Sequence, residues 1–384
     1  MPSDVIYLDH NATTPVDPRV LQAMLPYFTE AFGNAASIDH DYGHQAKQAV
    51  DKARTQIAAL INARPDEIIF TSGATESDNI ALFGVAEKYA DKGDHIITCV
   101  TEHKAVLDSC QRLEKLGKRI TYLPVDPYGL VDPDDVRRAI TPQTILISIM
   151  AANNEIGTLA PLTEIGQIAR EHDVLFHTDA AQAVGHVPLD VRAMSIHALS
   201  MSAHKVYGPK GVGALYRRRS NPRVRLEPVI YGGGHERGVR SGTLNVPGIV
   251  GFGEALRVAR GEMKEEAERF RGWTERIRQR LEAEVGEVLL NGHPTRRLSN
   301  NLNLSLPGIE SKALIVQLKG VALSTGSACT SAKVEPSHVI QALGFGDGRA
   351  HSAVRISVGR FNDDGQIDKA IRRIIQAINK LQFL

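Results

Sequence analysis

Short apolar runs alternate with amphipathic stretches over the first half of the chain. Seven runs have the length and composition of buried strands: EIIFTS, HIITCV, RITYLPV, TILISIM, VLFHTD, ALSMSAH and GVGALYR. Stretches such as ALFGVAEKYADKG and LTEIGQIAREHD lie between them and have helical spacing. Over residues 65–220 this order predicts an α/β fold, a mostly parallel sheet with helices on both faces. Ligands of such sheets bind beyond the carboxyl ends of the strands.

The pattern changes near Val250. A long charged stretch, GEALRVARGEMKEEAERFRGWTERIRQRLEAEV, predicts a helix that connects to a second unit. Beyond it, NNLNLSLPG, KALIVQLKG, VALSTGS and AVRISVGR predict a smaller α+β unit, closed by a helix over DDGQIDKAIRRIIQAINKLQFL. We therefore expect a large domain over residues 14–255 and a small domain formed by residues 1–13 and 256–384, which carries Cys329.

Charge and composition exclude several classes of protein. The 384 residues include 45 Lys and Arg against 44 Asp and Glu, so the net charge of +1 provides no general field for nucleic acid or an anionic membrane. The start, MPSDVIYLDHNATTP, does not resemble a signal peptide, and no apolar run approaches the roughly 20 residues that span a bilayer. We expect a cytoplasmic protein that acts on a small molecule.

The three cysteines are scattered without C-x-x-C spacing, which argues against a disulfide framework and against a zinc or other metal site. Cys99 and Cys110 lie in an apolar run and in a helical stretch, where buried and inert thiols are expected. Cys329 follows an apolar strand and lies among small polar residues in STGSACTSAK. This setting predicts an exposed thiol that acts as a nucleophile.

The segment FTSGATESDN is a candidate phosphate site. An apolar strand runs into Ser72, Gly73, Ala74 and Thr75, and a helix begins there. Small residues at a helix N-terminus expose backbone N–H groups, which bind phosphate well. A tight turn with Thr75 as an ordinary N-cap explains the same residues, so the segment alone leaves both interpretations open.

Asp179 and Lys205 each follow a predicted strand. A carboxylate at the end of VLFHTD can pair with a pyridinium nitrogen and keep it protonated, although an N-cap role is the simpler alternative. Gln182 follows in the same turn. Lys205 has Ser202 and His204 as neighbours, and a lysine beside a cofactor aldehyde forms a Schiff base, whereas most loop lysines are only solvated. The succession of the two segments, one strand apart, favours a cofactor site.

Two further residues are candidates on weaker grounds. Arg355 alternates with apolar residues in AVRISVGR, where a guanidinium can bind a substrate carboxylate through two hydrogen bonds. Arg360 lies nearby, and residue chemistry alone does not separate the two. His103 follows the strand HIITCV and can lie against a cofactor ring or move protons, but a structural histidine fits the same position.

Taken together, these segments resemble the cysteine desulfurases of the NifS and IscS type, which belong to the class V, fold-type I pyridoxal-phosphate enzymes. The resemblance covers nearly the whole chain in the family's order, through YLDHNATTPVDP, FTSGATESDN, TEHKAV, ANNEIGT, HTDAAQAVG, SAHKVYGPKG, GGGHERGVRSGTLN, STGSACTS and VRISVGR. The form STGSACTS matches the branch with the longer cysteine loop. Ala35 and the segment IDHDYGHQ depart from the family pattern, and we expect them to affect only early loop geometry.

The resemblance implies a role for each candidate residue. Lys205 carries the Schiff base with pyridoxal 5'-phosphate, and Cys329 accepts the sulfur. The remaining implied contacts are His103 on the cofactor ring, Asp179 on the pyridine nitrogen, Gln182 on the phenolic oxygen, Ala74, Thr75, Ser202 and His204 on the phosphate, Thr243 on the phosphate across a homodimer, Asn154 near cofactor and substrate, and Arg355 on the substrate carboxylate.

The implied activity removes sulfur from L-cysteine, gives L-alanine, and leaves a persulfide on Cys329 for a sulfur-acceptor protein, with an iron-sulfur cluster scaffold as the expected acceptor. A selenocysteine lyase uses the same cofactor residues without depending on Cys329 for selenium release. A sulfur-carrier or scaffold-binding protein without turnover is an alternative of another class. The presence of Lys205, Asp179, His103 and Cys329 together argues against that alternative.

Overall fold

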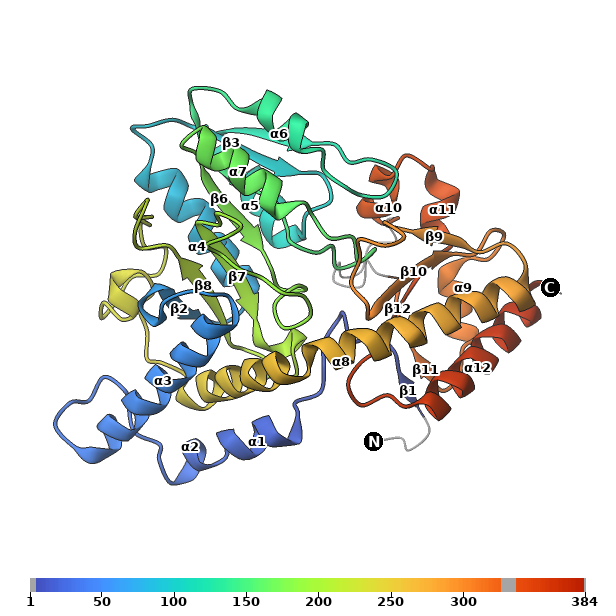
Figure 1. Ribbon diagram of the computed structural model, residues 1–384, viewed down its shortest axis with the longest axis horizontal. Coiled ribbons are helices and arrows are strands. Elements are labelled where there is room, and N and C mark those ends of the chain that lie inside the picture. Colours follow the sequence, from blue (N-terminus) through green and yellow to red (C-terminus); the bar gives the residue numbers. More distant parts are fainter. Residues whose placement is uncertain (1–4, 326–335, 383–384) are drawn as a thin grey trace.

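The computed structural model describes residues 5–325 and 336–382. A seven-stranded sheet forms the centre of the larger unit (Figure 1), in the spatial order β2-β8-β7-β6-β5-β3-β4. Its strands are β2 (Ile68–Thr71), β3 (His95–Cys99), β4 (Arg119–Leu123), β5 (Thr144–Ser148), β6 (Leu175–Asp179), β7 (Ala198–Ser202) and β8 (Gly213–Arg217). All neighbouring pairs are parallel except the two that β8 makes, which are antiparallel. The mostly parallel α/β sheet predicted from the sequence is therefore confirmed.

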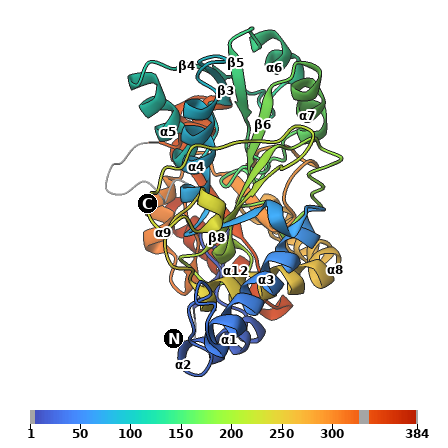
Figure 2. The ribbon, with the colours of Figure 1, turned by 90° about the vertical axis from the view of Figure 1, so that its left-hand side faces the viewer.

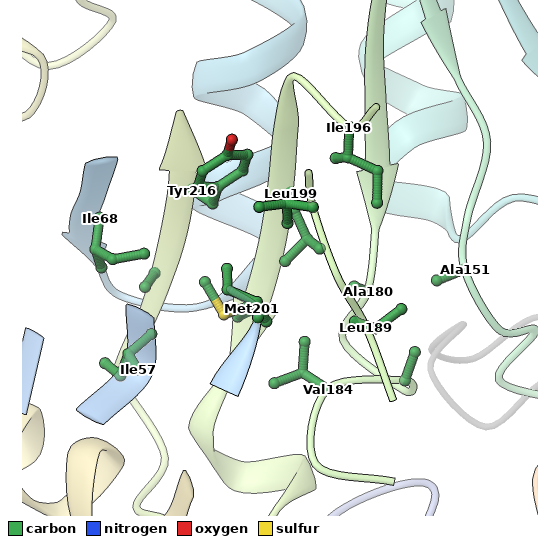
Figure 3. Packing of buried hydrophobic residues seen from close by; sticks show 14 of the residues in the cluster. Ile57, Ile68, Ala151, Ala180, Val184, Leu189, Ile196, Leu199, Met201 and Tyr216 are labelled. Carbon is green, nitrogen blue, oxygen red and sulfur yellow. The ribbon is translucent and has the colours of Figure 1, made fainter. Parts of the chain in front are cut away.

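Successive residues of each strand face opposite sides of this sheet, as the period of two requires. In β7, Leu199 and Met201 point into one core, where Tyr216 of β8 and Ile57 join them (Figure 3). Ala198 of β7 belongs to the core on the other face. Both faces are thus apolar, and each must be covered by helices.

Helices cover the two faces as separate layers (Figure 2). The helices α4 (Ala74–Lys88) and α5 (Lys104–Lys115) pack on one face, and α3 (Asp41–Leu60), α6 (Pro133–Ala139) and α7 (Leu162–Glu171) contribute apolar residues to the core of the other face. Two short helices, α1 (Pro18–Met24) and α2 (Pro26–Thr29), precede α3. Cys99 and Cys110 are buried in these cores, as expected for inert thiols.

A second unit contains two small sheets. One is antiparallel, in the order β12-β10-β9, with β9 (Leu289–Asn291), β10 (Asn301–Ser305) and β12 (Ala353–Ser357). The other pairs β1 (Ile6–Tyr7) with β11 (Val321–Ala322), so the N-terminal strand lies against the C-terminal part of the chain. The helices of this unit are α9 (Ser311–Gln317), α10 (His338–Ala342), α11 (Asp347–His351) and α12 (Asp364–Gln382).

One long helix, α8 (Val246–Val285), runs through both units (Figure 1). It begins earlier than the charged pattern indicated, with Asn245 as an N-cap that accepts a hydrogen bond from the Gly248 N–H and with Pro247 in the first turn. Its first part packs in the core of the large sheet, and its second part packs in the core of the small unit. The domain division at residues 255/256 stays a prediction, because α8 continues through it without a break.

The segment IDHDYGHQ was expected to affect only a loop. Instead it contains the start of α3, where His40 is the N-cap and accepts a hydrogen bond from the Gly43 N–H at 3.2 Å. Histidine is not among the preferred N-cap residues, which explains why the sequence did not indicate a helix start here.

Candidate active site

A cavity of about 540 Å³ lies at the carboxyl ends of the parallel strands, where the sequence predicted ligands to bind. It collects the segments that follow β2, β3, β5, β6 and β7, and residues of the small unit close one side. The predicted site residues that line it are Ala74, Thr75, His103, Asn154, Asp179, Gln182, Ser202, His204, Lys205 and Arg355. Five segments of the large unit and Arg355 of the small unit thus meet at one site.

The end of the cavity at α4 suits a phosphate group. Gly73 is the N-cap of α4, and Ala74 and Thr75 form its first turn, so backbone N–H groups face the cavity. Strand β8 passes close behind: a Cβ on Gly213 would lie 2.6 Å from the Gly73 Cα. Only glycine permits this approach, which fixes the turn from behind.

The Glu76 carboxylate also lines this end of the cavity, but it is engaged elsewhere. It accepts a hydrogen bond from the Ser72 N–H at 2.8 Å and from Arg240 Nε at 2.7 Å. Burial opposes its ionisation, yet these contacts with Arg240 and Ser72 hold its pKa below the usual value. The ion pair therefore neutralises a charge that would otherwise repel a phosphate.

Asp179 ends β6 and is buried, with its Oδ1 accepting a hydrogen bond from the Ala181 N–H at 2.9 Å. Burial raises its pKa, while His103, the Ala181 N–H and Lys205 oppose the rise. Two further carboxyls, Asp78 and Glu102, are also buried, and burial raises the pKa of both well above their ordinary values. Among these three acids Asp179 is the one that lines the cavity, where Lys205 and His103 oppose the rise of its pKa, so it is the one placed to pair with a cationic group of a ligand.

Lys205 lies in a short turn, Ala203–Lys205, directly after β7. Its Nζ donates hydrogen bonds to the carbonyl oxygens of Asn11 and Ala12, at 2.6 and 2.8 Å. The neighbouring His204 accepts or donates a hydrogen bond through Nδ1 with Thr13 Oγ1 at 3.1 Å. Burial, together with Lys205 and Lys210, lowers the pKa of His204 to about 4, so its ring is neutral at pH 7.

His103 is the N-cap of α5, and its Nδ1 accepts a hydrogen bond from the Ala105 N–H at 3.1 Å. This bond places the ring proton on Nε2 when the ring is neutral. The contact also fixes the ring at the wall of the cavity. His103 can therefore support a flat cofactor ring without leaving the helix terminus.

Arg355 of β12 closes the cavity from the small unit. Its guanidinium is fully buried and donates to the Asn154 carbonyl at 2.7 Å and to Asp9 Oδ1 at 2.8 Å, while Nε has no hydrogen-bond partner among the described residues. Arg360, the alternative, does not line the cavity. It pairs with Glu266 at 2.6 Å and with Asp17 at 2.8 Å, which is a structural arrangement.

One predicted residue lies away from the cavity, one falls outside the described residues, and several lining residues were not predicted. Thr243 is exposed and does not line the cavity, and Cys329 lies outside the described residues. Asn11, Thr13 and Lys210 line the cavity although the sequence assigned them no role. The quoted motifs HNATTP and GPKG contain all three, so position within a motif was the available signal.

The residues present fit pyridoxal 5'-phosphate. The N-terminus of α4 can bind the phosphate, Asp179 can pair with the protonated pyridine nitrogen, and Lys205 can form a Schiff base with the aldehyde. His103 supplies a ring at the wall between them. Each group comes from a different segment, so the fit is a property of the fold.

The family model described as aminotransferase class-V matches residues 6–370. The chain belongs to this family. Its members bind pyridoxal 5'-phosphate, which is the cofactor of this enzyme. A protein named cysteine desulfurase IscS from Anaeromyxobacter dehalogenans is 53% identical over 98% of this chain and 93% of its own length.

Solved structures agree with this membership of the aminotransferase class-V family. A structure titled NifS-like protein superposes with a TM-score of 0.91 at 37% identity, covering 99% of this chain and 100% of its own. A structure titled SspA in complex with cysteine gives a TM-score of 0.81 at 39% identity, covering 92% of this chain and 98% of its own. Within the described ranges of this class-V enzyme, no helix is long and apolar enough to cross a membrane and no cluster of His, Cys, Asp and Glu could hold a metal.

Proposed function

We propose that the enzyme is a cysteine desulfurase, which removes the sulfur of L-cysteine, releases L-alanine and leaves a persulfide on Cys329. The observation that carries the proposal is one cavity that holds Lys205, Asp179 and the N-terminus of α4 and is closed by the buried Arg355. An amino acid needs a group for its carboxylate beside the cofactor, and Arg355 is placed to supply it. The named relatives support cysteine as the substrate.

Each residue has a distinct task in this reaction. The Asn154 carbonyl and Asp9 fix the plane of the Arg355 guanidinium, so its remaining N–H groups can receive the substrate carboxylate in one orientation. Asp179 would pair with the pyridine nitrogen of the bound cofactor and hold a proton there, and the cofactor would supply an electron sink for the substrate α-carbon. Lys205 Nζ takes the α-proton, and the Asn11 and Ala12 carbonyls accept hydrogen bonds from its ammonium form.

The thiolate of Cys329 attacks the substrate sulfur, so a new S–S bond forms as the C–S bond breaks. The electron pair of the broken C–S bond passes to the carbon skeleton that becomes alanine. The role of Cys329 rests on its sequence, STGSACTS, because the residue lies outside the described ranges. The described chain that precedes this segment lies at the edge of the cavity: Ser324 Oγ donates to Asp9 Oδ1 at 3.1 Å, and the same oxygen accepts from Arg355.

The site residues, the assembly and the acceptor complete the proposal. Thr75, Ser202 and His204 bind the phosphate, and Gln182 contacts the phenolic oxygen. Thr243 reaches the phosphate of a second copy in a homodimer, which agrees with its exposed position. We assign residues 14–255 and 1–13 with 256–384 as the two domains. The sulfur passes in the cytoplasm, where thiols stay reduced, to an acceptor protein such as an iron-sulfur cluster scaffold.

The test is to incubate the purified holoenzyme with L-cysteine and a thiol reductant and to follow alanine and sulfide together. Equal amounts of both, abolished by alkylation of Cys329, support the desulfurase. Bound cofactor without either product would overturn the assignment. Selenide release from selenocysteine that survives alkylation, without sulfide from cysteine, would instead identify a selenocysteine lyase.

A further inference from the structure

Asn11 lies between β1 and α1 and is 2% exposed, and each of its polar atoms has a hydrogen-bond partner. Its N–H donates to Ser357 Oγ at 2.9 Å, and its Nδ2 donates to Gln182 Oε1 at 2.7 Å. Its Oδ1 accepts from Asn301 Nδ2 at 3.1 Å, and its carbonyl accepts from Gln182 Nε2 at 2.9 Å and from Lys205 Nζ. A residue bonded at every polar atom has one permitted orientation.

These contacts determine which way the Gln182 amide points. The Asn11 carbonyl can only accept, so it selects the Nε2 end of Gln182, and Asn11 Nδ2 can only donate, so it selects Oε1. Exchanging the two ends of the amide would set oxygen against oxygen and N–H against N–H. Gln182 lines the cavity, and its second Nε2 hydrogen is left for a ligand there.

The position of Asn11 is set by the small unit. Asn301 lies on β10 and Ser357 ends β12, and both belong to the three-stranded sheet. Gln182 and Lys205 follow β6 and β7 of the large sheet. Asn11 therefore carries the geometry of the small sheet to two groups of the large unit that face the same cavity.

We propose that Asn11 is a positioning residue for the cofactor. It orients the Gln182 amide so that an N–H, and not the C=O, meets the cofactor's phenolic oxygen. The proposal rests on the contact between Gln182 and that oxygen assigned above, and it explains why a residue of the small unit is needed to complete the cofactor site. It does not depend on which amino acid is the substrate.

The test uses Asn11→Asp, which keeps the size of the side chain but removes the donor to Gln182. Oε1 of Gln182 then faces a carboxylate oxygen in place of the Nδ2 donor, while the unchanged Asn11 carbonyl still accepts from Nε2, so no orientation of the amide satisfies both contacts. The N–H of Gln182 is no longer held on the phenolic oxygen, and the ionised form of that oxygen loses a hydrogen bond. We expect the pH at which the visible absorbance of the bound cofactor changes to rise by about one unit, the shift that corresponds to a buried hydrogen bond. We expect cofactor affinity to fall about 10-fold.

Two controls separate orientation from other effects. Asn303→Asp changes a fully buried asparagine on the same strand as Asn301. The Asn303 Nδ2 donates to the Glu155 carbonyl and its Oδ1 accepts from Asn291 Nδ2, so its side chain bonds neither Asn11 nor Gln182, and the substitution should leave the spectrum unchanged. In a Gln182→Ala background, Asn11→Asp should add no further spectral shift. If the spectral shift came directly from the new negative charge, it would also occur in the Gln182→Ala background.

Asn11→Ser keeps the result interpretable if Asn11→Asp binds no cofactor, because it removes the side-chain amide that reaches Gln182 and replaces it with a shorter, uncharged hydroxyl. It should shift the spectral transition in the same direction by a smaller amount. The proposal is overturned if neither variant moves the transition, or if the shift recurs in Asn303→Asp or survives in the Gln182→Ala background. These spectra need no cysteine, so failure of the desulfurase assignment would appear separately, as missing alanine.

Discussion

Nη2 of Arg355 lies 2.8 Å from Oδ1 of Asp9, and this contact joins β12 to the segment that follows β1 at the edge of the cavity. The pair holds a fully buried guanidinium beside the place where a substrate carboxylate must bind. A buried cation with a fixed plane is pre-organised for two parallel hydrogen bonds.

Arg355→Lys keeps the charge but removes the planar group that can make two bonds. We expect kcat/KM for L-cysteine to fall about 10-fold to 100-fold, mainly through a higher KM, because a charge-assisted hydrogen bond contributes roughly 1.5–3 kcal/mol. Steady-state kinetics measure this change. Arg360→Lys is the matched control: its ion pairs with Glu266 and Asp17 are structural, so its KM should stay near the wild-type value while its stability falls. A higher KM in Arg360→Lys with an unchanged KM in Arg355→Lys would instead identify Arg360 as the residue that binds the substrate carboxylate.

Lys205→Ala and Cys329→Ala should separate cofactor chemistry from sulfur transfer. Loss of Lys205 removes the covalent cofactor link and the group that takes the α-proton, so both the yellow colour and turnover should disappear. Cys329→Ala should stay yellow but produce no sulfide. Absorbance spectra and a sulfide assay measure both. Cys110→Ala, which alters a buried thiol that does not line the cavity, serves as the control and should retain activity. Full activity in Cys329→Ala would refute the role of Cys329.

Acid should destabilise the fold through neutral buried histidines. Burial lowers the pKa of His177 to about 3, and its ring contacts Ser148, Ser200 and, at 3.6 Å, Asp78. Between an unfolded pKa of about 6.5 and the folded value, only the unfolded chain binds the proton, so the free energy of unfolding falls by about 1.4 kcal/mol per pH unit as the pH drops. This loss is complete near pH 3.

Urea unfolding at a series of pH values measures this slope. Burial lowers the pKa of His10 and His197 to about 3 as well, so the wild-type slope contains their contributions in the same direction. His177→Gln, which keeps polar atoms for Ser148 and Ser200, should reduce the slope by the share of one histidine. An unchanged slope would mean that His177 binds its proton in the folded state.

A buried ion pair should matter more than an exposed one. Arg54 Nη2 lies 2.8 Å from Glu236 Oε1, and Glu236 Oε2 accepts a hydrogen bond from the Phe70 N–H at 2.7 Å. Glu236→Ala leaves the Arg54 charge buried, so we expect a loss of about 3–5 kcal/mol in urea unfolding. Lys47→Ala breaks an exposed pair with Asp51 and should cost less than about 1 kcal/mol. Equal losses would contradict this account.

The sequence was most informative where one element determines a residue's position. Asp179 and Lys205 directly follow buried strands, and parallel strands bring their carboxyl ends to one edge, so their meeting followed from the pattern of runs. The choice between an N-cap and a cofactor role for Asp179 required the spatial arrangement. Its neighbours His103 and Lys205, which oppose the rise of its pKa, come from other segments.

The sequence was least informative where distant segments meet. Asn11 precedes Asn301 by most of the chain, and no local pattern indicates that the two side chains are hydrogen-bonded. Arg355 and Arg360 could not be distinguished in the sequence because both belong to the segment AVRISVGR. Only the positions of their partners in the structure separated them. The start of α8 was missed because Pro247 and the glycines after it are poor helix formers, although Pro is well placed in a first turn.

The continuity of α8 limits how the two units can move. The 40-residue helix packs in the cores of both units and connects them rigidly, because bending it near residue 255 would break backbone hydrogen bonds. The walls of the cavity are therefore held at a nearly constant separation. Entry of a substrate and departure of a product must then be accommodated by side chains and loops at the cavity rim, and the spacing between Arg355 and Lys205 is set before any ligand arrives.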